Sequence, residues 1–118
     1  MNKEIAKERV RGYLHSLGYI IVDCDVMPFL SGITRVPYIA YDKRADAMIG
    51  VYIRERSNSR SNDLAEWKHK DKAYFRRATK RWCEKNDWHG KYRVDAIFVN
   101  ETGVLEHIEG ELNERRKK

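Results

Sequence analysis

Residues 91–99 read Lys-Tyr-Arg-Val-Asp-Ala-Ile-Phe-Val and give the clearest strand signal in the chain. The run from Ala96 to Val99 is apolar on both faces of such a strand. A strand of this kind has to be covered on both sides, as in sheets that carry helices on their two faces. The sequence therefore predicts a central strand over residues 91–99, in a sheet with helices packed on it.

In residues 47–56, apolar and more polar side chains alternate as in a β-strand. This predicted second strand precedes the central one in the chain. One face of this strand is apolar and consists of Ile49, Val51 and Ile53. The other face consists of Tyr52, Arg54 and Arg56. The pattern predicts that the apolar face packs on the core and that the second face reaches a more polar environment.

Residues 19–27 and 33–41 are predicted to form two earlier strands, and residues 104–108 a short later one. In the first of these, Asp23 and Asp25 are expected to share one face. The opposite face is then formed by Ile20, Val22, Cys24 and Val26. In the second strand, Pro37 has no amide hydrogen to donate, which places it at an edge, a bulge or a strand end.

Residues 3–17 and 64–86 have the apolar spacing of amphipathic helices, and Gly18 is expected to end the first. The second helix carries a stripe for packing on the sheet, formed by Leu64, Trp67, Tyr74, Phe75, Ala78 and Trp82. The sequence thus predicts an α/β fold with a mixed sheet and the element order α-β-β-β-α-β-β. We expect a single domain over residues 1–118, with a disordered charged tail at 113–118.

The composition fits a folded, basic protein rather than a disordered one. Of 118 residues, 42% are hydrophobic, and 24 lysines and arginines against 18 acids give a net charge of +6. No apolar run is long enough for a membrane span, and the charged residues 1–8 are unlike a signal peptide. The two cysteines, Cys24 and Cys83, lack metal-ligand spacing and are interpreted as reduced thiols of a cytoplasmic protein.

The excess positive charge is confined to one part of the chain. Residues 54–93 hold 13 lysines and arginines against 6 acids, whereas the rest of the chain is nearly neutral. A basic helix face beside a basic loop is typical of a surface that contacts phosphates, and a solvated helix face is the alternative. The candidate contact residues are Arg35, Arg54, Arg60, Lys68, Lys72, Arg76 and Lys80.

Four segments together resemble a known family. They are Tyr13-Leu14 followed by Gly18-Tyr19, the basic run Arg76-Arg77-Ala78, the strand Tyr92 to Val99, and Leu105-Glu106-His107-Ile108-Glu109. In order and spacing they are similar, over residues 4–112, to the small bacterial YraN-like family, which has the fold of the PD-(D/E)xK nucleases. The resemblance implies a restriction-endonuclease-like fold for this chain.

The resemblance also implies a metal site, and here the chain departs from the family. The family carries Gly-Glu-Ile-Asp on its second strand and Glu-Val-Lys on its third, and the carboxylates hold Mg²⁺. In this chain, Arg35 and Pro37 occupy the positions of that Glu and Asp, while Tyr52 and Arg54 replace the later Glu and Lys. Arginine is a poor proton acceptor. We therefore expect no metal and no cofactor, and a cationic pocket in place of the metal site.

Three functions follow from this interpretation. The first is a non-catalytic nucleic-acid-binding protein with a degraded nuclease site, whose partner is DNA in preference to RNA. The second is a Mg²⁺-dependent endonuclease that uses migrated carboxylates, for which Asp42, Asp46 and Glu55 are the candidates. The third is a module that binds an acidic protein. Among the histidines, His107 is interpreted as structural, with the orientation of a carboxylate as the alternative.

Overall fold

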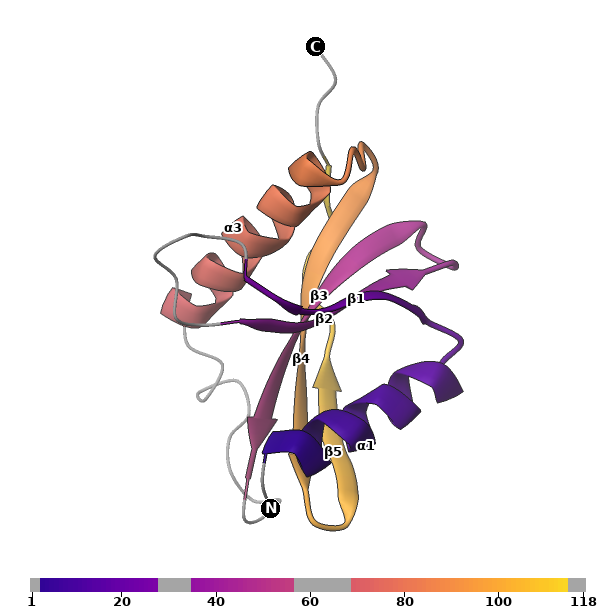
Figure 1. Cartoon of the computed structure of the whole chain (residues 1–118), viewed down its shortest axis with the longest axis vertical. Helices are drawn as coiled ribbons and strands as arrows, with labels where there is room; N and C mark the ends of the chain where they lie inside the picture. The colour runs from indigo at the N-terminus through magenta and orange to yellow at the C-terminus, as the bar shows by residue number, and fades with distance from the viewer. Residues whose placement is uncertain (1–2, 28–34, 57–68, 115–118) are drawn as a thin grey trace.

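The computed structural model describes residues 3–27, 35–56 and 69–114. Within these residues the chain forms two helices and a six-stranded sheet (Figure 1). In chain order the elements are α1 (Lys3–Ser16), β1 (Ile20–Val26), β2 (Val36–Asp42), β3 (Ala47–Glu55), α3 (His69–Lys85), β4 (Lys91–Asn100), β5 (Gly103–Ile108) and β6 (Asn113–Glu114). The predicted α/β class, with helices packed on a sheet, is confirmed.

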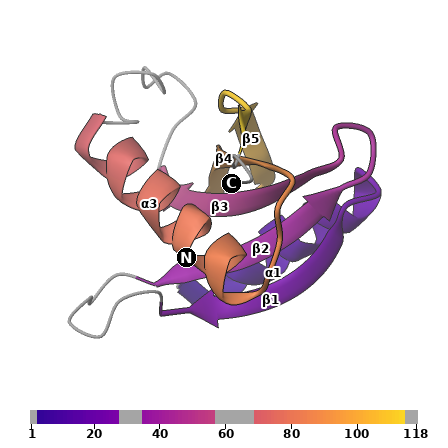
Figure 2. The same ribbon diagram turned by 90° about the horizontal axis from the view of Figure 1, so that it is seen from above.

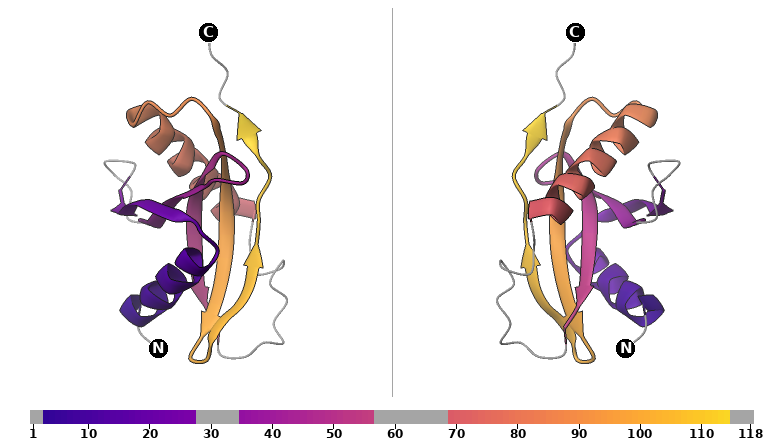
Figure 3. Two further views of the ribbon diagram at one scale, coloured as in Figure 1. Left: turned by 90° about the vertical axis from the view of Figure 1, so that its right-hand side faces the viewer. Right: turned by 90° about the vertical axis from the view of Figure 1, so that its left-hand side faces the viewer.

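The sheet is mixed, as predicted. Its strands follow the order β1-β2-β3-β4-β5, and β6 also pairs with β4. All neighbours are antiparallel except β3 and β4, which run parallel and are connected through α3. Figure 3 shows β5 and β6 following one another along the same side of β4. The strand at 91–100 therefore has partners on both edges, which confirms its central position.

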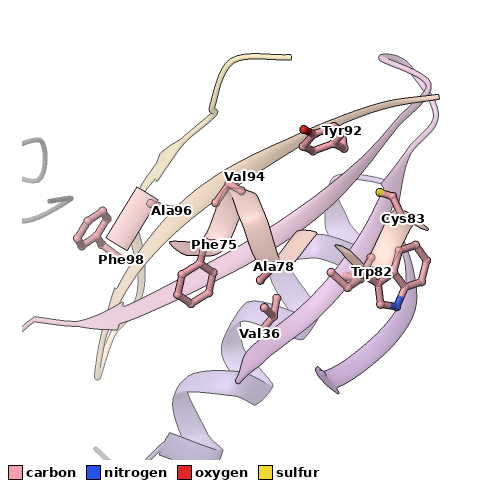
Figure 4. Close-up of a cluster of buried hydrophobic side chains, with 10 residues drawn as sticks. Val36, Phe75, Ala78, Trp82, Cys83, Tyr92, Val94, Ala96 and Phe98 are labelled. Carbon is pink, nitrogen blue, oxygen red and sulfur yellow. The ribbon is translucent and has the colours of Figure 1, made fainter. Parts of the chain in front are cut away.

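The two helices cover opposite faces of this sheet. On β4, Tyr92, Val94, Ala96 and Phe98 belong to the core beneath α3, whereas Ile97 and Val99 belong to the core beneath α1. Figure 2 shows α3 running along its side of the strands, and Figure 4 shows Phe75, Ala78 and Trp82 of α3 facing that core. Successive side chains of β4 therefore pack alternately into two separate cores, and this is why both faces of the strand are apolar.

Helix α3 approaches β3 closely at one point. A Cβ atom added to Gly50 would lie 1.9 Å from Oγ1 and 3.1 Å from Cβ of Thr79. Both residues are buried, and the Thr79 hydroxyl donates to the carbonyl oxygen of Phe75 one turn earlier. The missing side chain at Gly50 thus sets how near the basic helix lies to the sheet.

The predicted facing of the first strand is wrong. The Asp23 carboxylate accepts a hydrogen bond from Nε1 of Trp82 on α3 at 2.8 Å, whereas Asp25 pairs with Lys7 on α1. The two aspartates therefore lie on opposite faces, and Ile20 and Val22 are 46% and 43% exposed. The register of β1 against β2 shifts between residues 21 and 23, which changes the facing of Ile20 relative to the later residues of the strand. Asp25 has a φ of 51°, and this left-handed backbone conformation interrupts the alternation after Asp23.

The predicted disordered tail is also wrong in part. Asn113 and Glu114 pair with Tyr92 and Lys91 as the short strand β6. The Asn113 side chain strengthens this end by donating to the carbonyl oxygen of Glu111 at 3.1 Å. The predicted helix over 64–86 is present as α3, and Gly18, with φ of 82°, ends α1 as expected. Leu64 and Trp67 of the predicted stripe lie outside the described residues.

Candidate functional site

Three of the four positions that the sequence analysis assigned to a lost metal site, Arg35, Pro37 and Tyr52, meet in one pocket. The pocket has a volume of about 510 Å³ and lies where the start of β2, the end of β3 and the first turns of α1 converge. Pro37 and Tyr52 both line it, together with Phe75 of α3. We call it the β2–β3 pocket. Its size is in the range of small-molecule and cofactor sites.

The β2–β3 pocket was expected to be cationic, but it carries charges of both signs. Its charged lining residues are Lys3, Glu4, Lys7, Asp25, Arg35 and Glu55. Lys7 and Asp25 neutralise one another at 2.5 Å, and this hydrogen bond raises the pKa of Lys7 despite its partial burial. Arg54 is exposed and is not among the lining residues, and its Nη1 lies 3.5 Å from the Tyr52 hydroxyl. Arg35 and Tyr52 thus both line the pocket, whereas Arg54 reaches the Tyr52 hydroxyl without lining it.

The two pocket positions where the resemblance implies magnesium ligands do not carry them. Pro37 and Tyr52 offer no carboxylate at the two positions where the resemblance implies ligands. Within 3–27, 35–56 and 69–114, no three His, Cys, Asp or Glu side chains are grouped in a way that holds a metal. No step of a metal-dependent reaction is therefore derived from this site.

Two of the three migrated carboxylates have other roles. Asp42 is buried and pairs with Nη1 of Arg93 at 3.1 Å. Asp46 lies in the β2–β3 turn with φ of 52°, and its carboxylate accepts a hydrogen bond from the Tyr41 hydroxyl at 2.6 Å. Glu55 alone of the three lines the β2–β3 pocket. Asp42 and Asp46 therefore act in the packing of the β2–β3 turn and not in the pocket.

A buried network of charged groups lies on the α1 face of the sheet. Arg93 and Asp95 of β4 have side chains only 4% and 1% exposed, and they form two hydrogen bonds, of 2.9 and 3.2 Å. Arg93 also donates to the Tyr19 hydroxyl at 2.8 Å, in addition to its ion pair with Asp42. Asp95 accepts a further bond from His107 Nε2 at 2.7 Å. One guanidinium and one carboxylate thus connect β2, β4 and β5.

The same network reaches helix α1. Nδ1 of His107 lies 2.8 Å from the Tyr13 hydroxyl, and Gly110 donates its backbone N–H to Asp95. A neutral His107 satisfies both contacts when Nε2–H donates to Asp95 and Nδ1 accepts the Tyr13 proton. His107 therefore orients a carboxylate, the alternative that the sequence analysis had left open.

The acid–base properties of this network are those of a structural cluster. Burial alone would raise the pKa of Asp95, but the hydrogen bonds from His107 and Arg93 outweigh it and lower that pKa. Burial raises the pKa of Tyr13 and brings the pKa of Tyr19 to about 12. A tyrosine nucleophile needs the opposite shift, since the phenolate is the reactive form. The chain of contacts from Tyr13 through His107 to Asp95 thus fixes α1 to the sheet.

Sequence reasoning missed Arg93 and Asp95 as a site. Their signal was two opposite charges two residues apart, on one face of a strand predicted to be central. Lysine, arginine, aspartate and glutamate are almost never fully buried unless they are paired, so such a pair in a central strand indicates a buried ion pair. The partners Asp42, His107 and Tyr13 are distant in sequence and carry no comparable signal.

The basic face of α3 is exposed from Arg76 to Lys85. Helix α3 contains seven lysines and arginines against two acids. Arg76 and Lys80 are exposed and Lys72 is half-buried, and the spacing of four residues places these three along one side of the helix. Arg77, Arg81 and Lys85 are exposed as well. Of the predicted contact residues, Arg60 and Lys68 lie outside the described residues.

No protein-family model matches the chain, and no curated protein is similar to it at a significant level. Neither helix in the described part of the chain is long and apolar enough to cross a membrane.

Proposed function

We propose that this protein is a non-catalytic nucleic-acid-binding protein of the bacterial cytoplasm, with a restriction-endonuclease-like fold whose metal site has been lost. The observation that carries the proposal is the row of cations on α3, which is exposed at Arg76 and Lys80 and lies outside the core formed by Phe75, Ala78 and Trp82. Such a row matches the regular charge of a phosphate backbone. DNA is the expected partner in preference to RNA.

The resemblance to the YraN-like family supports the proposal from a second direction. The mixed sheet with a helix on each face, and the parallel pair β3 and β4 connected through α3, agree with the architecture that the resemblance implies. The pocket lined by Pro37 and Tyr52 lies on the strands where that family holds its metal. Without either carboxylate there, the pocket lacks the groups with which that family holds its metal.

The basic row should account for much of the salt dependence of binding. Replacement of Lys72, Arg76 and Lys80 by alanine is expected to flatten the slope of log K against log salt by up to about 2.7, because each phosphate contact to duplex DNA contributes about 0.9. The fold should persist, since alanine is a good helix former and these side chains lie outside the core. Fluorescence anisotropy with labelled duplex and single-stranded DNA over a salt series measures the slope.

A matched control removes three cations elsewhere. Arg11, Lys43 and Arg44 are exposed and lie on α1 and in the β2–β3 turn. Their replacement by alanine lowers the net charge equally and is expected to leave most of the slope intact. Equal slopes for the two triple variants would mean that α3 is only a solvated face. Competition by DNA of unrelated sequence separates nucleic-acid binding from binding to an acidic protein.

The endonuclease alternative has one supporting observation, since Glu4, Asp25 and Glu55 all line the β2–β3 pocket. We nevertheless expect calorimetric titration with Mg²⁺ or Mn²⁺ to give no saturable heat near neutral pH, and plasmid cleavage to stay at background. Metal-dependent cleavage that Glu55→Gln abolishes, and that the exposed control Glu101→Gln leaves unchanged, would establish the alternative instead.

A further inference from the structure

A second pocket lies beside the basic face of α3, next to the segment that connects β5 to β6. Its volume is about 420 Å³, and Figure 3 shows the segment between the two strands running along β4. Val94 and Ile108 form its apolar part. The polar lining residues are Lys72, Arg76, Glu109, Glu111 and Asn113. We call it the α3–β6 pocket.

Three of the charged side chains that line this pocket are not engaged in an ion pair with a described residue. Among the described residues, Arg76, Glu109 and Glu111 form no ion pair, although all three line the same hollow. In the β2–β3 pocket, by contrast, Lys7 and Asp25 pair at 2.5 Å. The α3–β6 pocket therefore offers a guanidinium and two carboxylates to a ligand that carries both an anion and hydrogen-bond donors.

The segment that supplies the carboxylates is held in place. Gly110 lies between them and donates its N–H to Asp95 of the buried network, and a Cβ atom at Gly110 would lie 2.1 Å from the Val94 carbonyl oxygen. On its other side, Asn113 donates to the Glu111 carbonyl oxygen, so its own Oδ1 remains an acceptor. Glu109 and Glu111 are thus carried on a backbone fixed at both ends, as a recognition site requires.

We propose that the α3–β6 pocket binds an unpaired guanine nucleotide of a nucleic-acid strand whose phosphates follow α3. Guanine is the base whose Watson–Crick edge presents two adjacent N–H donors, and one carboxylate accepts both. Adenine and cytosine pair a donor with an acceptor on that edge, which a carboxylate does not match. Arg76 and Lys72 supply the positive charge that binds the phosphate. Val94 and Ile108 supply the apolar surface against which the guanine ring packs.

This inference rests on the proposed function, and its test separates the two. Labelled oligothymidylates with one central guanine, adenine, cytosine or thymine are titrated with the whole protein at about 50 mM salt, where phosphate contacts are strong. We expect the guanine strand to bind about 5-fold to 150-fold more tightly than the other three, the discrimination that a bidentate contact to a base provides. Guanine placed within a duplex should lose this advantage, because its Watson–Crick edge is then occupied.

The double variant Glu109→Gln with Glu111→Gln should lose the guanine preference while it still binds all four strands, since an amide accepts only one of the two N–H groups. The control Glu101→Gln with Glu106→Gln removes two exposed carboxylates outside the pocket and should keep the preference. Binding of all four strands with equal affinity, or a preference that survives the first variant, overturns this inference alone. Absence of binding to every strand overturns the proposed function as well.

Discussion

Asp95→Asn is expected to lower the free energy of unfolding by about 3–5 kcal/mol, which is the cost of leaving one partner of a buried ion pair uncompensated. The carboxylate is 1% exposed and accepts hydrogen bonds from Arg93, His107 and Gly110. An amide at the same position retains the shape but not the charge, so Arg93 would remain buried and, among the described residues, keep only its ion pair with Asp42. For a domain of this size the melting temperature should fall by on the order of 15 °C.

The matched control for this substitution is Asp87→Asn. Asp87 also accepts a hydrogen bond from a histidine, His89 at 2.8 Å, but its side chain is 91% exposed. Exposed ion pairs contribute about 0–1 kcal/mol, so the control should melt close to the wild type. Urea unfolding followed by circular dichroism measures both variants. If the two substitutions cost the same, the buried network does not stabilise the fold.

The stabilisation of the folded protein by the Asp95 carboxylate is expected to decrease at low pH. Because the folded pKa of Asp95 is lowered, the folded protein releases this proton more readily than the unfolded chain, whose ordinary value is about 3.9. The stabilisation is then complete above the unfolded pKa and is lost as the pH falls through the folded pKa. The difference in unfolding free energy between wild type and Asp95→Asn should therefore be largest near neutral pH and narrow below about pH 4.

The fold was predictable from the sequence where the local pattern of apolar residues matches the side chains that are buried in the structure. The run from Ala96 to Val99 is apolar on both faces, and this alone identified the central strand. The stripe of Phe75, Ala78 and Trp82 identified the face of α3 that meets the sheet. The facing of the β1 side chains was not predictable, because no local pattern encodes the register shift between residues 21 and 23 or the positive φ of Asp25.

The candidate sites also differ in whether the sequence could predict them. The meeting of Pro37 and Tyr52 in one pocket follows from their positions on adjacent strands, so it was within reach of the sequence. The buried network could not be predicted from the sequence. Its members Tyr13, Asp42 and His107 are distant from Arg93 and Asp95 in the chain and meet them only in the tertiary fold. The α3–β6 pocket depends on β6, which was assigned to a disordered tail because a charged run at a chain end carries no pairing signal.

Gly50→Ala is the substitution expected to disturb the basic helix most directly. The new Cβ would lie 1.9 Å from Thr79 Oγ1, a distance that no packed structure tolerates, so α3 has to move away from β3 or Thr79 has to change its rotamer. Overpacking of a close-packed interior costs about 1–3 kcal/mol. Gly12→Ala is the matched control, because a Cβ there meets no atom within 4 Å and alanine in α1 should stabilise by about 0.5–1 kcal/mol.

A second substitution separates crowding from a backbone requirement. Thr79→Ala removes Oγ1 and Cγ2, the atoms at 1.9 and 3.3 Å, and leaves only Cβ at 3.1 Å from the added methyl group. If crowding is the cause, Gly50→Ala with Thr79→Ala should be more stable than the sum of the two single effects predicts, by about 1 kcal/mol or more. Additive effects would show that Gly50 is needed for its backbone and not for the approach of α3. Because α3 carries Lys72, Arg76 and Lys80, the crowded single variant should also lose affinity for DNA, and the double variant should recover it.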